Sequence, residues 1–165
     1  MPYAVTHVLV PIVLVDFLRD HVFKMKKRFL PNEYVLLAGL AGILPNIDIP
    51  FSLLFFRDIS FHHLLTHSIW LPLIFFNGFL ISYMYNKKRL YKIFLMLFVG
   101  FSIHILLDIS LFGELGLFYP FKMKLYGLNL LPLPNAALVY SSIDAVLLFF
   151  WLIHEELEHK ISDYF

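Results

Sequence analysis

Five apolar stretches constrain the fold of this chain more than any other feature of its sequence. They cover residues 3–18, 34–56, 68–85, 93–112 and 136–154. Each is close to the length of about 20 residues that an α-helix needs to cross the hydrocarbon core of a bilayer. The sequence therefore predicts an all-α, polytopic membrane protein with about five membrane helices, of which the first is short.

Composition supports a bilayer as the solvent. Of the 165 residues, 60% are hydrophobic and nineteen are Phe, more apolar surface than a soluble chain of this size can bury. No linker or repeat divides the chain, so we expect a single domain over residues 1–165. The net charge of +1 gives no reason to expect nucleic acid as a partner, and membrane lipid is the expected partner. The sequence predicts no particular oligomeric state.

The second apolar stretch carries its own interruption. Residues 44–50 (LPNIDIP) place two prolines and two polar side chains inside it. Proline removes a helical hydrogen bond, and irregular backbone at membrane depth is tolerated only where protein covers it or where it lines a cavity. We therefore expect a broken second helix with a functional site beside the break. A proline kink capped by Asn46 and Asp48 is the structural alternative.

Basic residues concentrate in the first and third loops: Arg19, Lys24, Lys26, Lys27, Arg28, Lys87, Lys88, Arg89 and Lys92. The second loop has Arg57 alone, and the fourth has Lys122 and Lys124. The positive-inside rule then makes the first and third loops cytoplasmic. We expect the chain in the plasma (inner) membrane, with its N-terminus outside.

Two ionisable residues lie inside the fourth apolar stretch. His104 and Asp108 are four residues apart, so their side chains share one face of a helix. Such groups are costly in hydrocarbon unless something binds them, and a divalent metal ion would offset that cost. Cysteine is absent, so any metal ion must use His, Asp or Glu. A buried pair satisfied by neighbouring helices is the alternative.

Other polar residues fall at the same predicted membrane depth, towards the outer face: His7, Asp48, His62, His63, His67, Ser142 and Asp144. They come from the first, second and fifth stretches and from the second loop. We therefore predict one outward-facing metal site. A solvated histidine is the alternative for each loop residue. Asp144 is expected either to orient a ligand histidine or to contact a bound ligand directly.

Five short sequence elements follow one another along the chain: Thr6-His7, residues 42–48 (GILPNID), 62–68 (HHLLTHS), 104–108 (HILLD) and 119–121 (YPF). With these elements the chain resembles the membrane-bound metal-dependent hydrolase family (YdjM-like). That family is distantly similar to the zinc-dependent phospholipase C and S1/P1 nuclease fold. The resemblance covers nearly the whole chain.

The resemblance implies a hydrolase with one or more divalent ions. The expected metal ligands are His7, Asp48, His62, His67, His104 and Asp108. His67 and Asp108 are the expected catalytic residues, His67 as a ligand or acid/base partner and Asp108 as the bridging carboxylate if two ions bind. Asn46, His63, Ser142 and Asp144 are expected to support ligands or to contact substrate. A His/Asp ligand set suits zinc, with manganese or iron as alternatives.

The expected reaction is attack of metal-activated water on a lipid phosphoester at the outer membrane face. Two positions depart from the family pattern, which usually has Asp at Asn46 and Arg at His63. Asn46 removes a negative charge, which weakens or eliminates a second metal site. His63 either replaces a phosphate-binding Arg or adds a ligand.

Three other functions fit parts of the pattern. A transporter of ions, protons or metals would line its path with buried His and Asp residues. A haem-binding electron carrier would need two facing histidines. A non-catalytic membrane scaffold with a degenerate metal site is the third alternative, because Asn46 lacks the carboxylate that the family usually has at this position.

Overall fold

A computed structural model of the chain describes residues 4–24, 29–57, 65–111, 115–128, 130 and 135–159. The regular secondary structure in this part of the chain is helical, with one isolated bridge between Leu115 and Tyr126, and residues 115–128 otherwise form turns and irregular backbone. The helices are α1 (Ala4–Phe17), the π-helical turn η1 (Leu18–Val22), α2 (Asn32–Ile43), the 3₁₀ turn η2 (Leu44–Ile47), α3 (Asp48–Phe56), α4 (Trp70–Met84), α5 (Lys88–Leu111) and α6 (Ala136–His159). The prediction of an all-α fold is confirmed.

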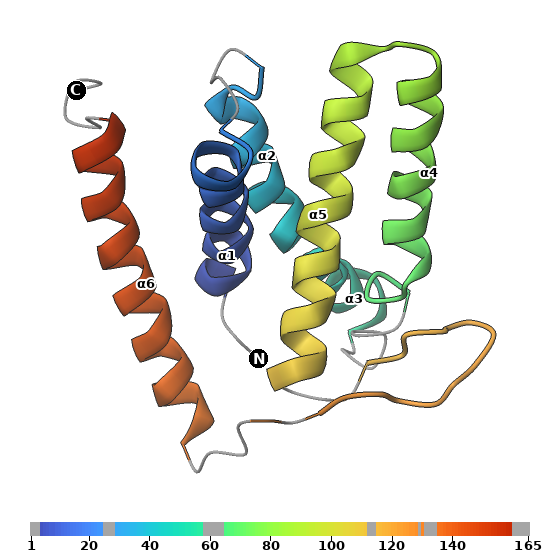
Figure 1. Cartoon of the computed structure of the whole chain (residues 1–165). Helices are drawn as coiled ribbons and strands as arrows, with labels where there is room; N and C mark the ends of the chain where they lie inside the picture. The colour runs from blue at the N-terminus through green and yellow to red at the C-terminus, as the bar shows by residue number, and fades with distance from the viewer. Residues whose placement is uncertain are drawn as a thin grey trace.

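The helices form an up-and-down bundle with α1, α2 and α5 at its centre (Figure 1). α4 packs against α5, and α6 packs against α1 on the opposite flank. The start of α1, the helix α3 and the loop that follows α5 all lie at one end of the bundle (Figure 1). We call this end the α3 end, and the end with η1 and the α4–α5 turn the η1 end.

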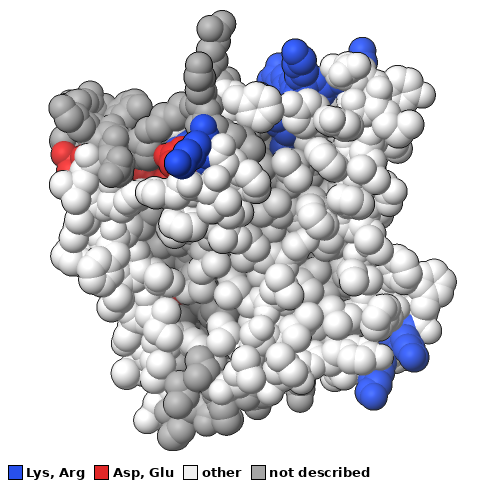
Figure 2. Space-filling view, viewed as in Figure 1, with Lys and Arg blue, Asp and Glu red and all other residues white. Residues whose placement is uncertain are grey.

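The bundle has the surface of a membrane protein. Three helical segments are long and apolar enough to span a bilayer: Asn32–Phe55, Lys88–Leu111 and Leu138–Leu157. The apolar helices α1 and α4 are shorter, with 14 and 15 residues, as predicted for the first stretch. On the face that Figure 2 shows, the middle of the surface is almost entirely white, and the Lys and Arg side chains lie towards the two ends. These features confirm a helical membrane protein.

The predicted interruption of the second helix lies where its prolines place it. Residues Leu44–Ile47 form a single 3₁₀ turn between α2 and α3, with Pro45 buried at the start of that turn. A proline is tolerated in the first turn of a helical segment because its missing N–H has no partner there. The break is therefore short, and Asn32–Phe55 still has the length of one span.

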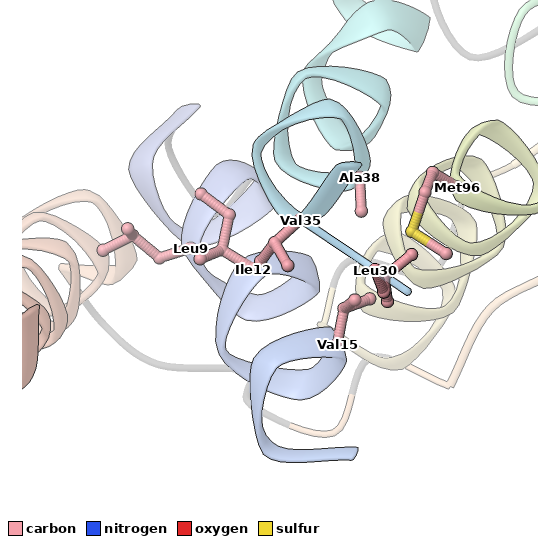
Figure 3. Packing of buried hydrophobic residues seen from close by; sticks show 7 residues of the cluster. All are labelled: Leu9, Ile12, Val15, Leu30, Val35, Ala38 and Met96. Atoms are coloured by element: carbon pink, nitrogen blue, oxygen red, sulfur yellow. The ribbon is translucent and has the colours of Figure 1, made fainter. Parts of the chain in front are cut away.

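The hydrophobic core lies between α1, α2 and α5. Its buried members are Leu9, Ile12, Val15, Leu30, Val35, Ala38 and Met96 (Figure 3). Towards the α3 end the helices approach closely enough for backbone to touch backbone. A Cβ added to Gly42 would overlap the carbonyl oxygen of His7 and lie 2.9 Å from Pro11 Cγ. A Cβ on Gly100 would lie 2.8 Å from the backbone nitrogen of Gly42. Small residues permit this approach.

We expect Gly42→Ala to destabilise the bundle. The new methyl group meets a backbone carbonyl that cannot move without shifting α1, so the unfolding free energy should fall by about 1–3 kcal/mol. This loss should exceed the gain of about 1 kcal/mol in helix propensity. Gly78→Ala is the matched control, because its Cβ meets only the ring of Phe94, at 2.8 Å. Denaturant titration in detergent micelles measures both, and equal stability of the two variants would contradict the packing argument.

Candidate metal centre

Four buried side chains meet at the α3 end of the bundle. His7 is the fourth residue of α1, His67 comes from the segment before α4, and His104 and Asp108 come from the C-terminal part of α5. Each is 0% exposed. These residues, which are far apart in sequence, are the largest cluster of buried ionisable groups at this end that the described residues form. We call the four residues the His/Asp cluster.

Asp108 lies at the centre of this cluster. Its Oδ1 atom is 3.1 Å from His7 Nε2. Its Oδ2 atom is 3.1 Å from His104 Nε2 and 3.6 Å from His67 Nε2. Each carboxylate oxygen therefore faces the Nε2 atom of at least one imidazole. The His7 and His67 rings flank that of His104, with ring centroids 4.1 and 4.9 Å away.

A backbone contact determines which nitrogen of His104 carries its proton. The Nδ1 atom lies 2.6 Å from the carbonyl oxygen of Gly42, which can only accept a hydrogen bond. Nδ1 is therefore the donor, and in a neutral ring Nε2 presents a bare lone pair to Asp108 Oδ2. Within the described residues, neither of these two atoms has a hydrogen-bond partner. Two acceptors this close require a cation between them, either a proton on the ring or a metal ion.

The ligand atoms of the cluster have the spacing that a metal ion requires. Ligands bonded to tetrahedral zinc at about 2.0–2.1 Å lie about 3.3 Å apart. The separations from Asp108 Oδ2 to the two imidazole nitrogens, 3.1 and 3.6 Å, bracket this value. One ligand atom each from His7, His104 and Asp108 lies within 4.8 Å of the others. His7, His104 and Asp108 therefore have the spacing of metal ligands, and His67 Nε2 lies 3.6 Å from the same carboxylate.

Asp48, predicted as a ligand, lies on the far side of His67 from Asp108. Its Oδ2 atom is 3.4 Å from His67 Nδ1, and it accepts a hydrogen bond of 2.6 Å from the Thr66 hydroxyl. The same hydroxyl is 3.0 Å from His67 Nδ1. A metal-ligating histidine is commonly oriented by a carboxylate that contacts the ring nitrogen not bound to the metal. This position suits a residue that positions His67 as well as one that binds metal.

Asp144 supports His7 from a different helix. Its Oδ1 atom accepts hydrogen bonds from the backbone N–H of Thr6, at 3.0 Å, and from the Thr6 hydroxyl. Thr6 lies in the first turn of α1, where backbone N–H groups have no partner within the helix. Asp144 therefore caps α1 in trans and fixes the backbone that carries His7. Of the two roles predicted for Asp144, this geometry favours support of a ligand histidine.

Ser142 is not brought to the cluster. It is exposed, and its hydroxyl donates to the carbonyl of Leu138 in its own helix at 2.9 Å. Residues two apart on a helix do not share a face, so α6 can direct only one of Ser142 and Asp144 towards α1. Asn46 lies in η2, and its Oδ1 atom is buried with no hydrogen-bond partner among the described residues. His62 and His63 lie outside the described residues.

Three contributors to the site were missed by the sequence interpretation: Thr6, Thr66 and the carbonyl of Gly42. A repeated dipeptide is the signal that could have found the first two, because Thr6-His7 and Thr66-His67 have the same order. In both pairs the threonine hydroxyl binds an aspartate on another segment. Nothing in the sequence marks the carbonyl of Gly42.

We expect Asp144→Ala to loosen the first turn of α1. Loss of a helix cap lowers stability by about 0.5–2 kcal/mol, so amide exchange over residues 4–10 should accelerate correspondingly. Ser142→Ala is the control, two residues away on the same helix, and should leave exchange in α1 unchanged. Hydrogen–deuterium exchange with mass spectrometry in micelles measures both variants. Unaltered exchange in Asp144→Ala would remove the capping role.

Comparison with known proteins gives one family. A family model described as YdjM inner membrane protein matches residues 1–159. No curated protein and no solved structure gives a significant match.

Proposed function

The chain belongs to the YdjM inner membrane protein family, and from this premise we propose that it is a membrane-embedded, metal-dependent hydrolase of lipid phosphoesters. The family and the apolar helices place the protein in a membrane. The catalytic part of the proposal rests on the His/Asp cluster.

One observation carries the proposal. His104 Nε2 and Asp108 Oδ2 are buried 3.1 Å apart, and the hydrogen bond to Gly42 assigns the proton of a neutral His104 ring to Nδ1. Two further imidazoles surround the same carboxylate. A divalent ion would satisfy His7, His104 and Asp108 at once and lie beside His67, whereas a single proton would satisfy only one of these contacts.

In this proposal, the buried histidines and Asp108 are the metal ligands. His7, His67, His104 and Asp108 would hold the ion, with His62 as a further predicted ligand. Zinc suits these nitrogen and oxygen ligands, and manganese or iron are alternatives. Such an ion would supply acidity to a coordinated water and would polarise a phosphoryl oxygen.

The surroundings of His67 also suit a proton carrier. A carboxylate beside Nδ1 stabilises the charge that the ring acquires when Nε2 takes up a proton. Asp48 has this position, and Thr66 holds the carboxylate by a hydrogen bond. His67 therefore fits either role predicted for it, ligand or acid/base partner.

Location suggests the substrate. The cluster lies at the α3 end, whereas η1, which carries Arg19, and the α4–α5 turn, which carries Lys87 and Lys88, lie at the η1 end (Figure 1). By the positive-inside rule, the cluster then faces the extracytoplasmic side. The nearest hydrolysable groups at that depth are the phosphoesters of membrane lipids.

A transporter fits the structure less well. Asp16 of α1 is buried beside Arg19 at the η1 end. Between this pair and His7, α1 presents only apolar side chains, among them the buried Leu9 and Ile12. The described residues therefore offer no continuous polar path along α1.

We expect His104→Ala and Asp108→Ala each to lose the bound metal and the hydrolysis of a phosphodiester and phospholipid panel. His154→Ala, at the η1 end, is the control and should retain both. Elemental analysis of the purified protein gives the metal content. Full metal content in the His104/Asp108 double variant would overturn the ligand assignment. Normal metal content in the wild type without turnover of any substrate would favour the non-catalytic scaffold.

Asp48→Asn separates the two roles of Asp48. A positioning carboxylate contributes about 10–100-fold in metal affinity, so a loss within that range is expected. Competition with a zinc chelator measures it. Complete loss, equal to that of His104→Ala, would instead make Asp48 a ligand.

A further inference from the structure

α6 is joined to α1 by a polar contact near each of its ends. Asp144 binds Thr6 at the α3 end, and His154 Nε2 lies 3.5 Å from Asp16 Oδ2 at the η1 end. Between these two contacts, space remains beside the α1–α6 interface. Three cavities, of about 350, 350 and 330 Å³, lie along this interface. We call them together the α1/α6 groove.

The middle of the groove is apolar. Its lining includes Leu9, Val13, Leu147 and Leu148, and polar side chains enter only at the η1 end. Apolar cavities do not retain water, and volumes of about 300–1,000 Å³ are typical of ligand pockets. A further helix, about 10–12 Å across, cannot enter while α1 and α6 touch. A hydrocarbon chain has the shape and chemistry that remain.

Trp151 indicates that the occupant also carries a hydrogen-bond acceptor. Its indole nitrogen is buried and has no hydrogen-bond partner within the described residues. The side chain borders two of the three cavities. A buried indole N–H normally donates to some acceptor. An ester carbonyl of a lipid would provide one beside an acyl chain.

The η1 end of the groove is acidic. Arg19, which follows α1 beyond its apolar part, is surrounded by Asp16, Asp20 and Glu155. A hydrogen bond to Asp20, together with the charges of the three carboxylates, raises the pKa of the guanidinium despite its burial. Three carboxylates therefore lie around one guanidinium, and His154 Nε2 lies 3.5 Å from Asp16 Oδ2. Asp16 and Glu155 line the cavity itself together with His21 and His154, so two carboxylates at its mouth can face a cation.

We propose that the α1/α6 groove binds one phospholipid with an ammonium headgroup. One acyl chain lies between α1 and α6, an ester carbonyl accepts from Trp151, and the ammonium group faces Asp16 and Glu155. The site is separate from the His/Asp cluster, at the opposite end of the bundle, and does not depend on the proposed hydrolase activity.

Tryptophan fluorescence provides a direct test. The chain has two tryptophans, so Trp70→Phe leaves Trp151 as the sole emitter. This protein is placed in vesicles of unbrominated phosphatidylglycerol that contain a small fraction of phosphatidylethanolamine with brominated acyl chains. The bromine atoms quench nearby indoles. The comparison uses brominated phosphatidylglycerol as the small fraction in unbrominated phosphatidylethanolamine. The brominated ammonium lipid should quench Trp151 at a roughly two- to fivefold lower mole fraction than the brominated anionic lipid. Equal quenching in proportion to mole fraction overturns the proposal.

Matched variants separate the headgroup from the chain. In the Trp70→Phe background, Glu155→Gln should abolish the preference for the ammonium lipid, whereas its neighbour Glu156→Gln should retain it. Val13→Phe fills the cavity and should reduce quenching by both lipids to the bulk level. Weak quenching by every lipid in the unfilled protein would point to a protein partner over α6, and would also overturn the proposal. His104→Ala should leave the preference intact, which separates this site from the metal centre.

Discussion

The close approach of α1, α2 and α5 at Gly42 is the contact on which the rest of the structure depends. Gly42 lies against the carbonyl of His7 and beside Gly100, so that no side chain separates the three helices. Its own carbonyl then reaches His104. A wider spacing would remove this hydrogen bond and draw His7 away from Asp108. Packing and site chemistry are therefore two consequences of the same small residues.

Each histidine of the cluster is held by a neighbour that is itself fixed by another segment. Gly42 of α2 orients His104 of α5, and Asp48 of α3 with Thr66 orients His67. For His7, the support is the cap that Asp144 of α6 provides to the first turn of α1. Buried ionisable groups are costly in a membrane unless such partners are in place. Their preorganisation also suits a site that must hold a cation in a defined geometry.

The bundle carries polar groups at both ends and apolar side chains between them. At the α3 end, imidazoles converge on one carboxylate. At the η1 end, carboxylates surround Arg19, which is 1% exposed. The chemistry of the two ends therefore differs, the first suited to a metal ion and the second to an ammonium group. Because α6 packs against α1 and leaves cavities beside it, this flank of the bundle has room for a lipid chain.

The sequence alone was sufficient for features that depend on local spacing. Hydrophobic length predicts the helices, the prolines predict the interruption at η2, and the four-residue offset predicts that His104 faces Asp108. Contacts between distant segments depend on helix rotation and on the distance between backbones, which local spacing does not determine. Only the tertiary structure shows Asp48 beyond His67, Asp144 on Thr6 and Ser142 turned away. The same reason applies to Arg19, whose burial depends on partners that no local pattern in the sequence reveals.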